Sequence, residues 1–195
     1  MLFVKARQSS LLALVLASLL ALAACGSSSA VASSPTSTPM PSATPLVNTV
    51  YTSTDGAYSI KIPATWKSEA LAVPSTSGAV SIINEASKDV FIIEPFTFRT
   101  TASTQSILGS SISDPSSFSG SKVDDTTTTK IYPSGSWIVA TASTTVNETA
   151  MSARLYRTEH GDRTVGLFIM MPTANATADQ TTYFDPMLTS FTFLK

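Results

Sequence analysis

Alternation of apolar and polar residues predicts a β-strand near the start of the region that follows residue 48. Tyr58, Ile60 and Ile62 alternate with polar neighbours, and the pattern stops at Pro63, as expected of a half-buried strand. Asp55-Gly56, just before these residues, is a tight-turn sequence of the kind that joins two short strands. The segment therefore predicts a small hairpin.

The same pattern predicts longer strands further along the chain. Residues 79–85 and 90–98 form a predicted hairpin around a turn at 86–89, and the run 90–93 is apolar on both faces. Four further strands are predicted at 122–132, 137–146, 151–159 and 163–171, separated by turn sequences that contain Pro133-Ser134-Gly135, Asn147-Glu148 and Gly161-Asp162. The last of these strands is again apolar on both faces, so both faces of the sheet are expected to be covered.

Two segments have helical spacing. Residues 103–112 predict a short helix, and residues 176–190 predict a C-terminal helix that Pro186 interrupts. Asp185-Pro186 fits a helix restart, with the Asp as N-cap and the Pro in the first turn. Residues 191–193 predict a short edge strand. We therefore expect an α+β fold, a mostly antiparallel meander with few helices, one on each face of the sheet.

The first 25 residues have the pattern of an export signal. Lys5 and Arg7 precede an apolar run over residues 11–23, which is too short for a membrane span of about 20 residues. The segment Leu22-Ala23-Ala24-Cys25 resembles the lipobox of bacterial lipoproteins. The resemblance implies a signal peptide over residues 1–24, cleavage between Ala24 and Cys25, and acylation of the Cys25 sulfur. The alternative is a plain secretory signal with an accidental cysteine.

Residues 26–48 contain no charged and no aromatic residue and are rich in Ser, Thr and Pro. Such a segment has little apolar surface to bury, so we expect a disordered tether that begins at the lipidated Cys25. All aromatic residues except Phe3 lie after it, which places the globular domain at 49–195. The predicted location is the bacterial cell membrane, facing outside the cytoplasm, with the lipid as the anchor.

Composition removes several classes of function. The chain has 12 Lys and Arg against 13 Asp and Glu, so it lacks the basic surplus that nucleic-acid binding requires. It has one cysteine and one histidine, which excludes an intrachain disulfide, cysteine metal clusters and multi-histidine zinc sites. We expect no bound metal and no cofactor.

Two motifs at the ends of the domain resemble PsbP-like proteins. Residues 55–66, DGAYSIKIPATW, are similar to the family's DG-x-[FY]-S-[IV]-x-x-P-x-x-W opening. Residues 183–193, YFDPMLTSFTF, are similar to its [FY]-x-x-[IM]-L-x-S-F-x-[FI] ending. Between these motifs only the order of strands matches.

The PsbP-like resemblance implies an α/β/α sandwich around an antiparallel sheet, the fold shared with the Ran-binding Mog proteins and lipoproteins such as LpqN. It also implies a role in binding proteins or helping assembly. The motif residues are apolar or turn-forming, so we interpret them as packing residues of the fold. They are Tyr58, Ile60, Pro63, Trp66, Leu188 and Phe191.

Three groups of residues could carry chemistry, and each has a simpler explanation. His160 with Glu159 and Asp162 is expected at a hairpin tip. Asp124-Asp125 adjoin on a predicted strand and would point to opposite faces. Ser119-x-x-Lys122 matches a nucleophile motif that requires a helix, but here it is predicted to lead from a loop into a strand.

These observations predict a lipid-anchored binding or assembly module without catalytic activity, with an unidentified protein partner. A small-ligand or metal carrier is the main alternative. A cell-envelope hydrolase that uses Ser119 and Lys122, or a carboxylate near His160, is the second alternative.

Overall fold

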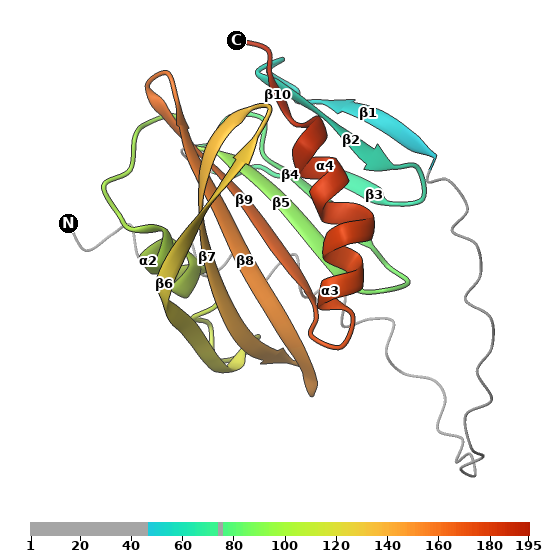
Figure 1. The fold of residues 1–195 in the computed structure, drawn as a ribbon, viewed down its shortest axis with the longest axis vertical. Helices are drawn as coiled ribbons and strands as arrows, with labels where there is room; N and C mark the ends of the chain where they lie inside the picture. Colours follow the sequence, from blue (N-terminus) through green and yellow to red (C-terminus); the bar gives the residue numbers. More distant parts are fainter. Residues whose placement is uncertain (1–46, 74–75) are drawn as a thin grey trace.

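A computed structural model describes residues 47–73 and 76–195 as two antiparallel sheets with helices packed against them (Figure 1). The predicted signal peptide, Cys25 and most of the tether lie outside these residues. Seven strands form the larger sheet, in the order β3-β4-β5-β9-β8-β7-β6. They are β3 (Lys67–Ala70), β4 (Val80–Asn84), β5 (Asp89–Pro95), β6 (Ser119–Tyr132), β7 (Gly135–Val146), β8 (Thr149–His160) and β9 (Arg163–Pro172). The remaining strands, β1 (Asn48–Thr52), β2 (Tyr58–Pro63) and β10 (Thr192–Phe193), form the smaller sheet in the order β1-β2-β10.

The predicted meander accounts for only part of the larger sheet. Strands β6 to β9 follow one another as antiparallel hairpins, as predicted. Strand β5 then pairs with the free side of β9, for example Val90 with Met170. The hairpin β4–β5, which comes earlier in the sequence, therefore extends the sheet on that side of β9. The turn between β7 and β8 holds only Asn147 and Glu148, both at positive φ, which is the backbone that a two-residue hairpin of type I′ requires.

The predicted edge strand near the C-terminal end of the domain is present as β10. It pairs antiparallel with β2, where Thr192 lies opposite Ser59. The first and last segments of the domain therefore share the smaller sheet. Strand β3 was not predicted, because its four residues KSEA are all exposed and carry no alternating pattern.

The helix restart at Pro186 was predicted incorrectly. The helix runs through α3 (Ala176–Asp179), the π-helical turn η1 (Gln180–Phe184) and α4 (Asp185–Ser190), drawn as one red coil in Figure 1. The backbone N–H of Asp185 bonds the carbonyl of Gln180, five residues back. Pro186 has no N–H to donate, and the wider turn lets the helix continue past it. Asp185 makes no capping hydrogen bond; it accepts one from the Gln180 amide at 2.6 Å.

The shorter predicted helix is present as α2 (Thr104–Ser111). Ser103 is its N-cap, and the side-chain oxygen accepts a hydrogen bond from the backbone N–H of Ser106 at 3.1 Å. Leu108 and the C-cap residue Ile112 are fully buried against the larger sheet. The helix therefore covers one face, as predicted.

Two hydrophobic cores lie on opposite faces of the larger sheet. Strand β9 alternates between them: Leu167 and Ile169 belong to the core under the C-terminal helix, and Phe168 and Met170 belong to the core under α2. This confirms the prediction that both faces of β9 are covered. Met170 and Met171 are core residues on opposite faces.

Candidate functional site

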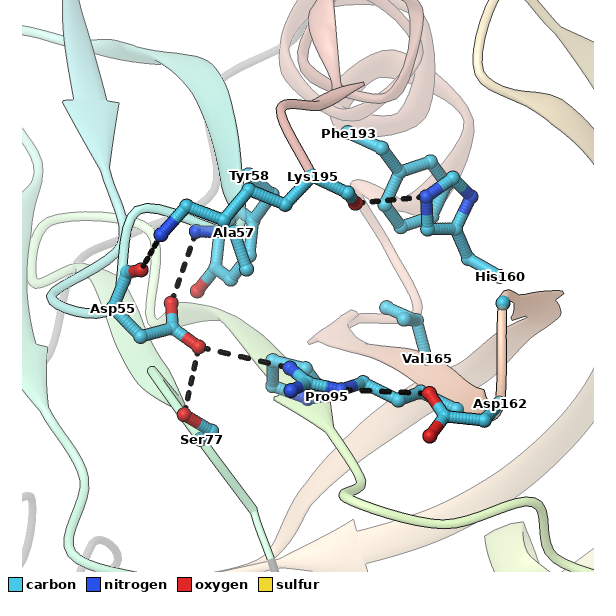
Figure 2. A pocket seen from close by; sticks show the side chains of 12 residues that line it. Asp55, Ala57, Tyr58, Ser77, Pro95, His160, Asp162, Val165, Phe193 and Lys195 are labelled. Atoms are coloured by element: carbon cyan, nitrogen blue, oxygen red, sulfur yellow. Dashed lines mark hydrogen bonds and ion pairs between the residues drawn. The ribbon is translucent and has the colours of Figure 1, made fainter.

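A pocket of about 390 Å³ opens where the smaller sheet meets the turn between β8 and β9 (Figure 2). Figure 2 shows its side chains arranged around an open centre, with the β8–β9 turn opposite the β1–β2 turn. The lining residues are Asp55, Ala57, Tyr58, Ser77, Pro95, His160, Gly161, Asp162, Arg163, Val165, Phe193 and Lys195. The pocket is thus built from five separate stretches of the sequence.

Asp55 occupies the predicted tight turn between β1 and β2. Its carboxylate accepts hydrogen bonds from the hydroxyls of Ser53 and Ser77, both at 2.7 Å, and from the backbone N–H of Ala57 at 3.1 Å. Burial opposes ionisation of Asp55, but these hydrogen bonds together lower its pKa. Gly78 packs so close that an added Cβ would lie 2.6 Å from the carboxylate. Asp55 is therefore a fixed anion in the wall of the pocket.

Arg163, the first residue of β9, crosses the pocket between two carboxylates. Its Nη1 lies 3.9 Å from Asp55 Oδ2, and its Nε lies 4.0 Å from Asp162 Oδ1. Both distances exceed that of a hydrogen bond. The Arg163 side chain is 41% exposed, so the guanidinium keeps access to anything that enters the pocket.

His160 and Phe193 stack at the opposite rim, with ring centroids 3.8 Å apart and planes within 5°. His160 Nε2 lies 2.9 Å from the carbonyl oxygen of Lys195. Lys195 in turn donates from Nζ to the backbone carbonyl of Asp55 at 2.7 Å. These contacts hold the β8–β9 turn against the end of the smaller sheet.

The remaining wall is apolar. Tyr58, Pro95 and Val165 line it, and the Tyr58 hydroxyl donates to the carbonyl of Gly78 at 2.6 Å. Burial raises the pKa of Tyr58, with smaller contributions from Tyr51 and Asp55. Tyr58 therefore stays neutral, and its buried ring forms part of the closed floor of the pocket.

This arrangement suits binding better than acid–base catalysis. Nucleophilic catalysis needs a base in hydrogen-bond contact with a nucleophile. The pocket hydroxyl of Ser77 donates to Asp55, whose lowered pKa makes it a weak base. The only pocket histidine, His160, is bonded to a backbone carbonyl. The pocket does, however, combine apolar walls with a few polar groups, as ligand-binding sites do.

The six residues of the two terminal motifs that were predicted to be packing residues are all buried. Trp66 packs against Tyr183 and Phe184 of the C-terminal helix, with ring centroids 5.3 and 5.7 Å apart. Tyr58 stacks on Phe191 at 5.3 Å. The two motifs thus contact each other across the core. Of the six packing residues only Tyr58 lines the pocket, whereas Asp55, Ala57 and Phe193 line it from other positions of the two motifs. Ala24 and Cys25 lie outside the described residues.

The two candidate sites of the predicted hydrolase, Ser119 with Lys122 and the acids near His160, lie far apart. Ser119 pairs with Thr145, which pairs with Ala150 at the start of β8, whereas His160 ends β8. His160 lies ten residues along β8 from Ala150, about 33 Å at about 3.3 Å per residue.

Ser119 and Lys122 also depart from their predicted loop-to-strand placement. Both are exposed on β6, which starts at Ser119 instead of Lys122. A register shift between these two residues, with Gly120 at φ +60°, lets pairing begin early.

The other predicted acidic groups are structural. Glu159 accepts hydrogen bonds from Arg157 and Thr164 beside the predicted hairpin tip. Asp124 accepts from the hydroxyl of Thr141 next to a register shift in β6. Within residues 47–73 and 76–195, no group of three His, Cys, Asp or Glu side chains is placed to hold a metal ion. The same stretch contains no helix with the length and hydropathy of a membrane span.

Sequence reasoning missed Asp55, Arg163 and Lys195 as residues of one site. Asp55 carried only a turn signal, and Arg163 only marked the start of a strand. Nothing in the sequence indicates that β10 would bring Lys195 to Asp55, because that contact depends on the pairing of β10 with β2.

No protein-family model matches the sequence, and no curated protein matches it either. The fold, however, is similar to that of a cyanobacterial PsbP from Synechocystis sp. PCC 6803. That likeness has a TM-score of 0.53 and 10% identity, and it covers 80% of this chain and 99% of the other. The similarity, together with the antiparallel sheets and few helices, confirms the predicted PsbP-like α+β fold.

Two weaker structural likenesses have TM-scores below 0.5. The Ran-binding protein Mog1p of Saccharomyces cerevisiae is 12% identical, with a TM-score of 0.48 over 75% of this chain and 95% of its own. LpqN of Mycobacterium tuberculosis, involved in cell envelope biogenesis, is 9% identical, with a TM-score of 0.45 over 77% of this chain and 92% of its own. The fold assignment rests on the cyanobacterial protein.

Proposed function

We propose that this protein is a lipid-anchored binding or assembly module that acts outside the cytoplasm and has no catalytic activity. The anchor part rests on the sequence, where Leu22-Ala23-Ala24-Cys25 follows a short apolar run and carries the chain's one cysteine. Acyl chains contribute about 0.8 kcal/mol per buried CH₂, and stable attachment takes more than one chain. A multiply acylated Cys25 meets that requirement.

The single observation that carries the binding role is the pocket beside Arg163. Its Asp55, Ser77, His160 and Lys195 side chains are held by hydrogen bonds within the protein. Groups fixed in this way shape a recognition site without being poised to transfer a proton to a substrate. A partner or ligand would meet a preformed surface.

A tether of residues 26–48 fits this role. As a flexible chain it would span about 25–30 Å r.m.s., and its prolines would extend it further. The first strand of the described domain is β1, which is exposed and forms one edge of the smaller sheet. The domain could then reach partners above the membrane surface.

The anchor is tested with the full chain expressed in a bacterial host that processes lipoproteins. We expect the wild type to enter the detergent phase of a Triton X-114 extraction and to incorporate radiolabelled palmitate. Cys25→Ser should abolish the label and leave the precursor uncleaved, and Ser28→Ala in the tether should behave as wild type. A wild-type protein found wholly in the aqueous phase, or a labelled Cys25→Ser variant, would refute the anchor.

The binding role is tested by crosslinking in native membranes followed by mass spectrometry. A protein crosslinked to wild type, and lost when the domain is unfolded by a core substitution such as Trp66→Ala, would support an assembly module. Turnover of envelope substrates by the purified chain, lost in Ser119→Ala or Lys122→Ala, would instead support the hydrolase.

The pocket also favours a second candidate, a small-ligand carrier. Its volume of about 390 Å³ falls within the range of about 300–1,000 Å³ that is usual for ligand cavities. Carrier and assembly roles differ in whether the pocket is filled by a free molecule or by a side chain of a partner.

A further inference from the structure

We propose that the pocket binds an organic carboxylate, with the acid group on Arg163 and the apolar body against Tyr58, Val165 and Phe193. The proposal deepens the binding role described above and rests on it for its physiological meaning. The contacts themselves concern only the described residues of the domain.

The Arg163 guanidinium has two ion-pair partners in the described structure, and both are distant. They are carboxylate oxygens of Asp55 and Asp162 at 3.9 and 4.0 Å, beyond hydrogen-bond reach. A guanidinium carries five N–H donors in a planar fork that matches a carboxylate. A carboxylate ligand would give these donors the short hydrogen bonds that the protein does not.

Two cations and two anions surround the pocket. Asp55 is ionised and fixed at one end of Arg163, and the exposed Asp162 lies at the other. A singly charged carboxylate gains from Arg163 and from the ammonium of Lys195, which donates to the neighbouring Asp55 carbonyl. Doubling the ligand charge, as in a phosphate dianion, doubles both the attraction to these two cations and the repulsion from the two aspartates. Comparison of 4-fluorobenzoate with 4-fluorophenyl phosphate, below, tests the carboxylate against the phosphate directly.

The apolar wall of the pocket belongs to the hydrophobic core. Tyr58 is 1% exposed, and Val165 is 3% exposed, so the floor of the pocket is solid core. The Phe193 ring stacks on His160, with ring centroids 3.8 Å apart, and meets Phe191 edge-to-face, with centroids 5.1 Å apart. A ring or short alkyl chain can bury apolar area here at about 25 cal/mol per Å².

The test uses the purified full chain and four fluorinated probes observed by ¹⁹F NMR line broadening. They are 4-fluorobenzoate, 4-fluorophenyl phosphate, 4-fluorobenzamidine and 4-fluorobenzamide, which share a ring and differ in charge. We expect 4-fluorobenzoate to bind most tightly, and Arg163→Gln to weaken it by about tenfold or more, as loss of a bidentate charged contact would. Arg163→Lys, which keeps the charge without the fork, should weaken it by a smaller factor.

Lys130→Gln is the matched control, because it removes one positive charge from an exposed residue of β6, which lies three strand positions, about 14 Å, from the strand β9 that carries Arg163. It should change benzoate affinity by less than about twofold. The unfolding midpoint of each variant is recorded, so that loss of binding can be separated from loss of fold. Equal or tighter binding of the benzamidine, unchanged benzoate affinity in Arg163→Gln, or no binding of any probe would overturn the proposal.

Competition identifies the source of the carboxylate. The peptide acetyl-Ala-Glu-Ala-amide presents the group as a protein side chain does, and hexanoate presents it as a free acid. Stronger displacement of 4-fluorobenzoate by hexanoate supports a carrier of small acids, and stronger displacement by the peptide supports capture of a partner's acidic side chain. These measurements need neither membrane nor partner, so their failure is distinguishable from failure of the anchor or of the assembly role.

Discussion

The two faces of the larger sheet are packed in different ways. Under the C-terminal helix and the smaller sheet, the core contains many aromatic rings in stacked and edge-to-face contact, including Trp66, Phe91, Trp137, Phe184 and Phe191. Under α2, the core is mainly aliphatic, with Phe118 and Phe168 as its aromatic members, and it is rich in small residues on β7 and β8. These are Ala140, Ala142 and Ala153.

The difference follows from which segments cover each face. The aromatic face is closed by β2 from the start of the domain and by the helix and β10 from its end. The aliphatic face is closed by the single short helix α2, whose neighbours in sequence supply Phe118 and Ile112. The pocket lies at the end of the aromatic face, so the segments that complete this core also build the site.

The largest effect is expected from breaking the aromatic face. Trp66→Ala removes a ring that is 6% exposed and packed against Tyr183 and Phe184, and should cost about 3–5 kcal/mol of unfolding free energy. Urea denaturation followed by circular dichroism measures the loss. A variant that unfolds at the wild-type midpoint but fails to bind its partner would place Trp66 in an interface instead.

A smaller effect is expected from the aliphatic face. Leu108→Ala removes the fully buried side chain with which α2 contacts the sheet, and should cost about 2–3 kcal/mol. The shallow packing of a short helix leaves the neighbouring side chains free to relax into the space. Carboxylate binding in the pocket should be preserved in folded Leu108→Ala, and a loss there as large as that of Arg163→Gln would contradict the separation of the two faces.

The elements that sequence reasoning predicted are those whose signal is local. The hairpins carry both period-two alternation and turn sequences such as Asn147-Glu148, and α2 carries a serine N-cap. The exposed strand β3 carries neither signal. It is a strand only because it pairs with β4, a contact that its own sequence does not indicate. The π-helical turn was also missed, since the same residues fit a restarted α-helix until the path of the backbone past Pro186 is known.

The pocket could not have been predicted in the same way. It depends on pairing between β10 and β2 and on the position of the β8–β9 turn, which are contacts between segments far apart in the sequence. His160 illustrates the limit: its turn was predicted, but its stacking on Phe193 comes from the tertiary fold. The motif residues were recognisable because packing residues recur at regular spacing near both ends of the domain.

The smallest effect concerns the two acids that β5 presents, one to each face. Asp89 is fully buried under the start of the C-terminal helix, and Glu94 lies on the face that α2 covers. Burial raises the pKa of Asp89, with a further contribution from Asp179, and burial raises the pKa of Glu94. Asp89 Oδ1 and Asp179 Oδ2 have no hydrogen-bond partner among the described residues.

A raised pKa in the folded state means that the fold binds more protons than the unfolded chain, so each of these acids makes stability fall as pH rises from its ordinary pKa through the raised value. Asp89→Asn removes the ionisable group and should therefore stabilise the protein at neutral pH, by about 1 kcal/mol. Near pH 3, where Asp89 is protonated in both states, the gain should vanish. Glu94→Gln should show the same trend for the other face.

Thermal unfolding between pH 3 and 8 measures both variants against wild type. A gain that is the same at both ends of this range would show that the substitution acts through packing, and a loss at neutral pH would show that the Asp89 carboxylate is held ionised by a favourable contact.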